Sequence, residues 1–461
     1  MNRTFLTSIF LLVLPVLAVS ADDDAPTAWE LSPYRVHLLT AVESSASLSP
    51  RLEQDIPTYL AARASSAVGG TWRLEASEAP LELRYRLLHS LGNLTAEDIP
   101  AAAKKGDKVI LLGIAKGEPG FIVRARELDL TTGLWNTTAT RIVRQSSSVK
   151  QEALWCLLSA FAPQARIEKV EDKIVTLKLR ASALARTEGD LPLFLAGTVF
   201  RPVLVKCDTH GTIQVGPTEA IPWTYLIPTE NKTSTSPFTA RIETGLSDAV
   251  LPEYHPTRLR LALGVRPSQD ATTIKLVATG SAAPLEGYEI AAVEPEVAGQ
   301  PGLVESLGRS GPDGIVSVPT GKTTVRTLLV RHGEEVLARL PMVPGLTEEI
   351  TVTLADDRPR LAIESILNGI QDNLLDLVAR REVLVSRIKA ATKEGDTAAA
   401  AKLKDQLRLL PSVGLILADL GKQQRPIEAL PVSSRHKMQK RIVEIRKLAE
   451  KLKAENPADK L

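Results

Sequence analysis

The chain has 461 residues, of which 44% are hydrophobic and 24% are charged, and its mean hydropathy is close to zero. This length and balance exclude a disordered or fibrous chain and predict about three folded domains. Only 4% of the residues are aromatic, which argues against an extended stacking surface for glycans or single-stranded nucleic acid.

The first 21 residues are typical of a secretory signal peptide. Arg3 precedes an apolar run over residues 5–19, and small residues stand before the acidic triplet 22–24. The run is too short to cross a bilayer comfortably, and no later run of 18 apolar residues follows. Cleavage after Ser20 and cleavage after Ala21 fit equally well. The sequence therefore predicts an exported protein without a transmembrane segment once the signal is removed; a retained N-terminal anchor helix is the alternative.

Residues 30–162 alternate between helix and strand periodicity, which predicts an α/β domain. The pattern predicts strands at 34–42, 71–76 and 108–114, a hairpin of 121–130 with 134–144, and helices at 50–68, 81–91 and 149–161, the first of them kinked or restarted at Pro57. The order of "DKVILLG", the hairpin "ARELDLTTGLW" and an amphipathic helix resembles the TolB amino-terminal and curli-lipoprotein-like domains of bacterial envelope proteins. The resemblance implies an envelope-associated assembly role and transfers no functional residue.

Residues 165–247 are rich in short strands separated by turn residues, which predicts a small, SH3-like β-barrel. The expected strands are 167–179, 198–206, 213–216, 224–227 and 239–244. Trp223 and Tyr225 could line a groove that reads extended, proline-rich peptides. Packing of both rings in the core or at the rim of the barrel is the alternative.

Residues 258–354 show a second β pattern, which predicts an immunoglobulin-like or transthyretin-like sandwich. Seven short strands are expected, at 258–263, 274–278, 288–293, 315–318, 325–331, 335–340 and 350–354. The turn "SGPDGIVSVPTG" and the hairpin "TVRTLLVRHGEEVLARLPMVPG" resemble those of carboxypeptidase regulatory-like and transthyretin-like domains. In those families such domains are accessory and carry no catalytic centre.

Residues 359–456 predict a helical hairpin or bundle with coiled-coil spacing. Apolar residues step by four and three along the first helix, with Arg381 as the one interruption: Ile363, Leu367, Ile370, Leu374, Leu377, Leu384, Ile388 and Ala391. Residues 394–396 supply a glycine stop and a new N-cap. A second copy of the chain could complete the bundle. The linker 355–359 is predicted to be a hinge, with burial beginning only at Leu361.

The charge of the chain is unevenly distributed. Residues 358–461 contain 21 Lys and Arg against 13 Asp and Glu, a net charge of +8, which leaves −7 for residues 22–357. This asymmetry favours an anionic partner for the tail or contact between the two halves, and a solvated helical face is the simpler account. We expect the tail to bind anionic polymer or lipid only weakly, because its apolar stripe lacks Trp and Phe anchors.

Two cysteines cannot form a disulfide scaffold. Cys156 lies in a predicted apolar helix, and Cys207 lies in a strand-like segment of the next domain. The two could pair and join the domains, which would stabilise the protein by about 2–4 kcal/mol. Burial as separate thiols is the alternative, because they lie in different predicted units.

The sequence contains no motif of a nucleophile elbow, zinc protease, redox thiol pair or phosphate loop. Its six histidines are scattered at spacings that predict no metal site, and we predict no catalytic residue, cofactor or nucleic-acid partner. The favoured function is that of an exported, non-catalytic modular protein with a structural or protein-binding role in the periplasm or envelope of a bacterium. The competing class is a hydrolase whose site assembles from distant residues. Titratable side chains converging in a cavity would distinguish the two.

Overall fold

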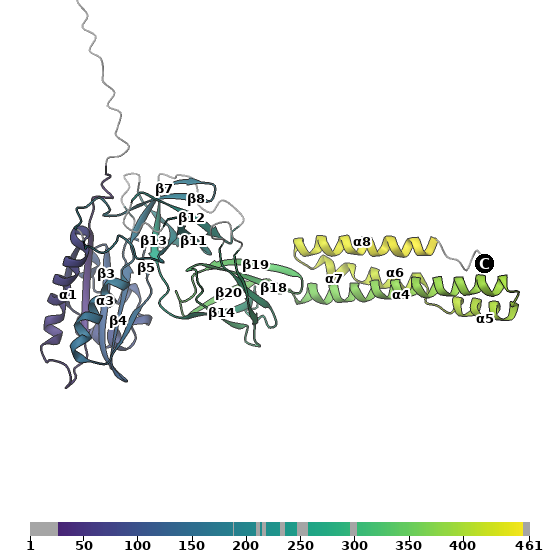
Figure 1. The fold of residues 1–461 in the computed structure, drawn as a ribbon, viewed down its shortest axis with the longest axis horizontal. Helices are drawn as coiled ribbons and strands as arrows, with labels where there is room; N and C mark the ends of the chain where they lie inside the picture. The colour runs from purple at the N-terminus through teal and green to yellow at the C-terminus, as the bar shows by residue number, and fades with distance from the viewer. Residues whose placement is uncertain are drawn as a thin grey trace, which may run out of the picture. The chain divides into compact units, whose positions relative to one another are not determined.

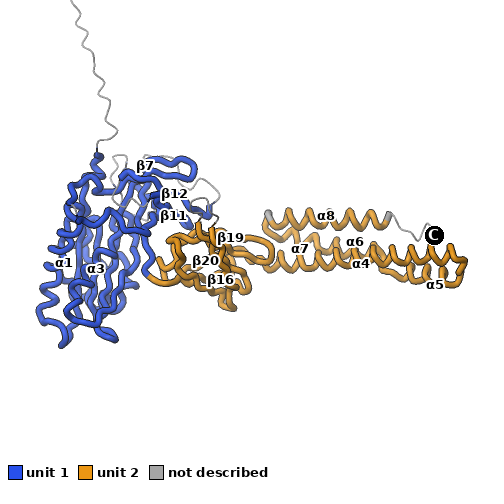
Figure 2. The backbone as a smooth tube through the Cα atoms, in the orientation of Figure 1, with its two compact units in different colours: residues 1–268 blue, residues 269–461 orange. Residues whose placement is uncertain are grey.

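The computed structural model describes residues 26–187, 189–208, 213, 218–230, 236–246, 257–295 and 302–454. The chain divides into two compact units, residues 1–268 and 269–461 (Figure 2). Unit 1 contains an α/β domain and a β-barrel, and unit 2 contains two small sheets and a helical region (Figure 1). The class is therefore mixed α+β, as predicted. The expected signal peptide lies outside the described residues.

The α/β domain is a six-stranded sheet with helices on both faces. The strand order is β2-β1-β3-β4-β5, with β6 also paired to β4, and β1 is parallel to both β2 and β3. Helices α1 and α3 bury their apolar residues on one face, and α2 buries its own on the other. The elements are β1 (Tyr34–Val42), α1 (Leu52–Val68), β2 (Trp72–Glu78), α2 (Leu81–His89), β3 (Lys108–Gly117), β4 (Gly120–Asp129), β5 (Leu134–Trp135), β6 (Ala139–Val143) and α3 (Val149–Ala160).

Helix α1 shows how the sequence pattern produces this layer. Leu52, Ile56, Leu60 and Ala64 recur every four residues, so they share one face, and all four are buried against the sheet. The helix continues through Pro57 as one element, so the predicted restart at this residue is wrong.

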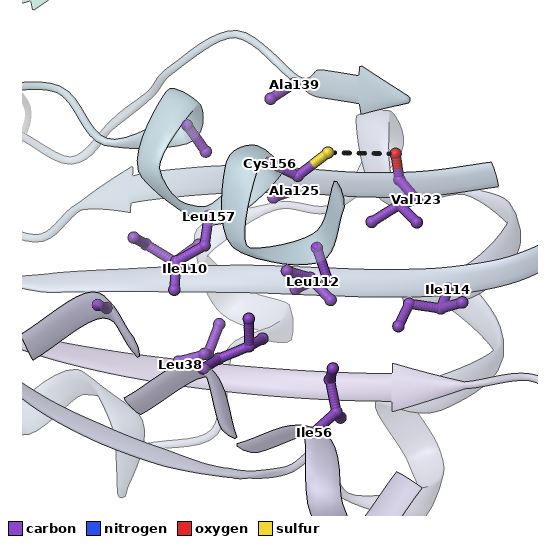
Figure 3. Close-up of a cluster of buried hydrophobic side chains, with 14 of the residues drawn as sticks. Leu38, Ile56, Ile110, Leu112, Ile114, Val123, Ala125, Ala139, Cys156 and Leu157 are labelled. Carbon is purple, nitrogen blue, oxygen red and sulfur yellow. Dashed lines mark hydrogen bonds between the residues drawn. The ribbon is translucent and has the colours of Figure 1, made fainter. Parts of the chain in front are cut away.

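The two cysteines lie in separate cores. Cys156 of α3 packs among the strands β1, β3 and β4, and its Sγ donates a hydrogen bond to the carbonyl oxygen of Val123 at 3.5 Å (Figure 3). Cys207 is buried at the end of a barrel strand, where it forms an isolated bridge with Ile213. The structure draws no bond between the two sulfur atoms, and the disulfide that the sequence leaves open stays a prediction.

The barrel is a closed ring of six strands in the order β9-β11-β12-β8-β7-β13, and the ring closes because β13 also pairs with β9. Phe194, Phe200 and Phe238 fill its interior, with ring centroids 5.2–5.5 Å apart. The strands are β7 (Gln164–Glu171), β8 (Ile174–Leu179), β9 (Val199–Lys206), the short β10 (Glu219–Ala220), β11 (Thr224–Pro228), β12 (Phe238–Thr244) and β13 (Arg258–Val265). A small barrel is thus confirmed, and its SH3-like character stays a prediction.

Two strand predictions in this region are wrong. The single strand expected at 167–179 is the hairpin β7–β8, which turns at Asp172 with a left-handed φ of 51°. The strand expected to open the sandwich, 258–263, is β13 of the barrel, paired with β7 and β9. Apolar alternation predicts a half-buried strand, but it carries no information about the sheet to which that strand belongs.

Unit 2 begins with a three-stranded and a four-stranded sheet, ordered β17-β14-β20 and β16-β15-β18-β19. The strands are β14 (Ala271–Ala278), β15 (Glu289–Val293), β16 (Val304–Arg309), β17 (Ile315–Pro319), β18 (Arg326–His332), β19 (Glu335–Met342) and β20 (Glu349–Leu354). Strand β16 was not predicted from the sequence. This edge strand is exposed along almost its whole length, so its residues do not alternate between buried and exposed. An immunoglobulin-like or transthyretin-like topology stays a prediction.

The helical region has two parts. Helices α6, α7 and α8 pack on α4 as far as Leu377, and we call this part the proximal bundle. Beyond it α4 contacts α5 (Figure 1). The helices are α4 (Arg358–Lys393), α5 (Thr397–Arg408), α6 (Val413–Lys422), α7 (Gln424–Glu428) and α8 (Val432–Ala454). The turn between α4 and α5 uses Gly395 at a φ of 78° and Asp396, whose side chain accepts a hydrogen bond from the amide of Ala399, as predicted.

A buried polar cluster joins α4 to the strands of unit 2. Asp357 accepts hydrogen bonds from Arg360 at 2.6 and 2.8 Å, and its other contact is the ring of His332 at 3.0 Å. That ring stacks on Tyr288, whose hydroxyl accepts a hydrogen bond from the amide of Asp357. Arg360 is only 1% exposed. Burial therefore begins before Leu361, and the expectation of an unburied linker is wrong.

Candidate functional site

Titratable side chains converge where the sheet of the α/β domain meets the barrel. Lys108 of β3 forms ion pairs of 2.7 Å with Glu127 and with Asp129 of β4, and all three side chains are completely buried. The hydrolase hypothesis requires titratable side chains that converge, so the surroundings of this cluster show whether it could serve as such a site.

The carboxylate oxygens of this cluster are all engaged. Glu127 accepts from the amide of Ala162 with the oxygen that does not face the lysine. Asp129 accepts from Gln164 at 2.6 Å with one oxygen, and from the amide and hydroxyl of Thr132 with the other. Each carboxylate oxygen thus already accepts at least one hydrogen bond inside the protein, and none of the three side chains reaches solvent. The arrangement fastens the barrel to the sheet.

The electrostatics agree with a structural role. Burial raises the pKa of Glu127 to about 7, although Lys108 works in the opposite direction. Burial raises the pKa of Tyr34, whose hydroxyl accepts from the amide of Gln164, to about 12. Burial would lower the pKa of Lys108, but Asp129 and Glu127 outweigh it and the net shift is upward. The lysine is therefore held as a cation and cannot act as a base.

The surface best suited to a partner lies at the far end of the helical region. We call residues 379–410, the second half of α4 with α5 and the residues after it, the distal hairpin. It carries an apolar hollow of about 380 Å³, lined by Ala379, Arg380, Val383, Leu384 and Leu410. Val383 is 55% exposed and the nearby Leu409 is 84% exposed. Helices α6–α8 cover the apolar face of α4 as far as Leu377. They do not extend over the distal hairpin, which therefore keeps apolar side chains exposed.

The distal hairpin is also positively charged. It contains eight Lys and Arg against four Asp and Glu. Arg380 borders the hollow with a side chain 65% exposed and forms an ion pair of 2.8 Å with Asp376, one turn earlier on α4. Arg381 buries its Nη1 atom, which has no hydrogen-bond partner among the described residues. An apolar hollow with cationic edges suits an acidic, amphipathic helix.

The sequence-predicted peptide groove involves two residues at the start of β11. Trp223 is half-buried and has a left-handed φ of 49°, and Tyr225 is only 9% exposed. Tyr225 therefore offers little ring surface to a peptide. The groove stays a prediction.

Serine and histidine are residue types that could act in catalysis or metal binding, and Ser310 has a structural role. The hydroxyl of Ser310 donates to the carbonyl of Leu285 at 2.6 Å and accepts from the amide of Tyr288, so it fixes a turn. Among the described residues no group of three or more His, Cys, Asp and Glu could hold a metal ion. His210 and His255 lie outside that part of the chain.

Sequence reasoning missed the Lys108 cluster. A usable signal was present, since a lysine opens the otherwise apolar strand of "DKVILLG", and Glu127 and Asp129 lie at alternate positions of the strand with which it pairs. No helix in the described part of the chain is long and apolar enough to cross a membrane.

No family model and no curated protein matches this chain. Among solved structures, the pilus 2b backbone protein of group B streptococcus has 14% identity and a TM-score of 0.15, covering 42% of this chain and 99% of its own. TolB from Acinetobacter baumannii has 13% identity and a TM-score of 0.18, over 71% and 98% of the two chains. BcpA, the major pilin subunit of Bacillus cereus, has 8% identity and a TM-score of 0.12, over 51% and 63%. TM-scores this low carry no argument about the fold or role of this chain.

Proposed function

We propose that this protein is an exported, non-catalytic modular binding protein of the bacterial envelope or periplasm, and that its distal hairpin binds an acidic, amphipathic helix of a partner protein. The observation that carries the proposal is the apolar hollow at Val383 and Leu384, which no other helix of the described chain covers and which basic residues border. A helix added at this position would bury the apolar side chains of the hollow, as α6 and α8 bury those of α4 in the proximal bundle.

Charge favours a partner of another kind over a second copy of the chain. Each distal hairpin has a net charge of +4. Two of them in contact would therefore repel each other at short range. A partner helix with glutamate and aspartate beside its apolar stripe would instead meet the positive charge of the distal hairpin, and its carboxylates would compete with Asp376 for the exposed Arg380. The homo-oligomer that the sequence leaves open therefore becomes an outcome of the test.

The test uses the full mature chain and a pair of synthetic peptides of about three heptads. Both peptides carry leucine at the two apolar heptad positions, and their remaining positions are glutamate in one and lysine in the other. Fluorescence anisotropy should show at least about tenfold tighter binding of the glutamate peptide. Equal binding of both peptides, or self-association of the protein through this surface in sedimentation, would contradict the proposal.

A matched pair of variants locates the binding surface. Val383→Glu places a carboxylate in the hollow and should abolish binding of the glutamate peptide. Val443→Glu makes the same change at an exposed valine of α8 outside the hollow, and it should leave binding unchanged. Equal loss in both variants would show that the peptide responds to net charge alone.

The exported location is tested separately. Expressed in a bacterium with residues 1–21 present, the protein should accumulate in the periplasmic fraction with a new N-terminus at Ala21 or Asp22. Retention of Met1 in the membrane fraction would favour the anchor alternative.

A further inference from the structure

Unit 1 contains a pocket of about 70 Å³ between the α/β domain and the barrel, which we call the seam pocket. Its walls come from the end of α1, the start of β2, the end of α3 and the segment 191–195, which leads into β9. This pocket is separate from the distal hairpin, and no motif in the sequence pointed to it.

Part of the lining of the seam pocket is aromatic. The rings of Trp72 and Phe161 lie 4.4 Å apart, and Phe194 of the segment 191–195 adds a third ring from the barrel side. Trp72 is 7% exposed and Phe194 is 5% exposed, so the wall is formed by side chains that are already ordered by packing. Such a wall favours an apolar body.

Three arginines also line the seam pocket: Arg180, Arg186 and Arg266. Arg180 forms an ion pair of 2.8 Å with Asp107. Arg266, directly after β13, donates from Nη2 to the carbonyl oxygen of Ser159 at 3.0 Å and has no described carboxylate within 4 Å. Burial lowers the pKa of Arg266, and no neighbouring carboxylate offsets the effect. A partly buried guanidinium without an anion has donors to spare.

A second arginine of the pocket has an unused donor. Arg186 donates to the carbonyl oxygen of Leu191, and its Nε atom is buried without an acceptor among the described residues. Asp190 faces Arg186 from the same loop, so Arg266 is the principal cation without a carboxylate. Buried polar groups without partners are uncommon in folded proteins and mark places where a further group can bind.

We propose that the seam pocket binds a small carboxylate with a short apolar body, of the size of acetate. Its carboxylate would accept hydrogen bonds from Arg266 and Arg186, and its methyl group would lie against Trp72 and Phe161. The size follows from comparison, since a cavity of about 150 Å³ holds benzene and this pocket is roughly half as large, so it suits a ligand distinctly smaller than benzene. Arginine is the side chain best matched to a carboxylate, which it can bind through two parallel hydrogen bonds.

The full mature protein tests the proposal without any substitution. Acetate and the isosteric acetamide are titrated at matched ionic strength and followed by calorimetry and by tryptophan fluorescence. The acid should bind at least about tenfold more tightly than the amide, because only the acid neutralises Arg266. Equal affinities, or no heat and no change in emission with the acid, would overturn the proposal.

Three variants then assign the roles. Arg266→Gln should weaken binding of acetate at least about tenfold, whereas Arg258→Gln, at an exposed position of β13, should not change it. Trp72→Phe should keep calorimetric binding and lose the fluorescence response. Unchanged affinity in Arg266→Gln would show that the carboxylate is not held by this arginine. If that variant does not fold, the comparison of acid and amide in the natural protein still decides.

Discussion

At the scale of single residues, the energetic weight lies in two buried charge clusters. Lys108 holds Glu127 and Asp129 inside unit 1, and Arg360 holds Asp357 inside unit 2. Removing one partner of a buried pair leaves the other charge without compensation and typically costs about 3–5 kcal/mol, which is a large share of the stability of a domain. Neither cluster is needed for the proposed binding, so both can be tested through stability alone.

The first prediction concerns pH. Burial raises the pKa of Glu127 in the folded state to about 7, above its ordinary value, so the folded protein holds a proton there that the unfolded chain has released. The free energy of unfolding should therefore fall by about 1–3 kcal/mol as the pH rises from 5 to 8. Glu127→Gln, which cannot titrate, should flatten this dependence in urea unfolding.

Asp98 supplies the control for this measurement. Its hydrogen bonds with Arg86 and Thr95 lower its pKa to about 2, so it stays ionised throughout the range from pH 5 to 8. Asp98→Asn should leave the slope of stability against pH unchanged. An unaltered slope in Glu127→Gln would show that another group titrates.

The second prediction concerns the cluster that joins α4 to the strands of unit 2. Arg360→Leu leaves Asp357 buried with only His332 beside it, and should lower the free energy of unfolding of unit 2 by about 3 kcal/mol in urea. Arg358→Leu removes an exposed pair with Asp356 and should change it by less than about 1 kcal/mol. Similar losses in the two variants would mean that the burial of Arg360 carries no special weight.

At the scale of elements, the sequence predicts which face of a helix is buried better than it predicts which strands pair with each other. The four-residue steps of α1 and the heptad steps of α4 named buried residues correctly, except for the partly exposed Leu384, because a helix folds its own pattern into one face. The partners of β13 and the edge strand β16 were not predictable, because strand pairing depends on segments far away in the chain.

The same difference between local pattern and long-range packing applies to the candidate sites. The interruption of the apolar seam at Arg381 marked where the proximal bundle ends and the distal hairpin begins. The hollow itself could not be predicted, because it depends on which stretch of α4 the later helices cover. The pairing of Lys108 with two carboxylates required the register of β3 on β4, which the sequence alone does not give.

The third prediction tests the closure of the barrel by β13. A chain of residues 22–247 lacks this strand, so β7 and β9 would expose unpaired edges, and it should be insoluble or fail to unfold cooperatively. A chain of residues 22–268 retains the strand and should show a single cooperative transition by circular dichroism. Cooperative unfolding of the shorter chain would show that the barrel does not depend on β13.

At the scale of the whole molecule, the chain consists of two units that each carry their own core. The fourth prediction is that residues 22–268 and residues 269–461, expressed separately, each fold, and that their calorimetric transitions together reproduce those of the full chain. A loss of more than about 2 kcal/mol of stability in either fragment would reveal an interface that stabilises both units.

The length of α4 determines the direction in which the distal hairpin faces relative to the proximal bundle. One continuous helix of 36 residues carries both the seam of the proximal bundle and the apolar hollow. Because an α-helix turns about 100° per residue, one residue inserted after Leu377 would rotate the hollow by that angle away from its present direction. Seven inserted residues would restore it to within about 20°. The direction in which the protein presents its binding surface is therefore set by a residue count along α4, and evolution can redirect the surface without altering a single side chain in it.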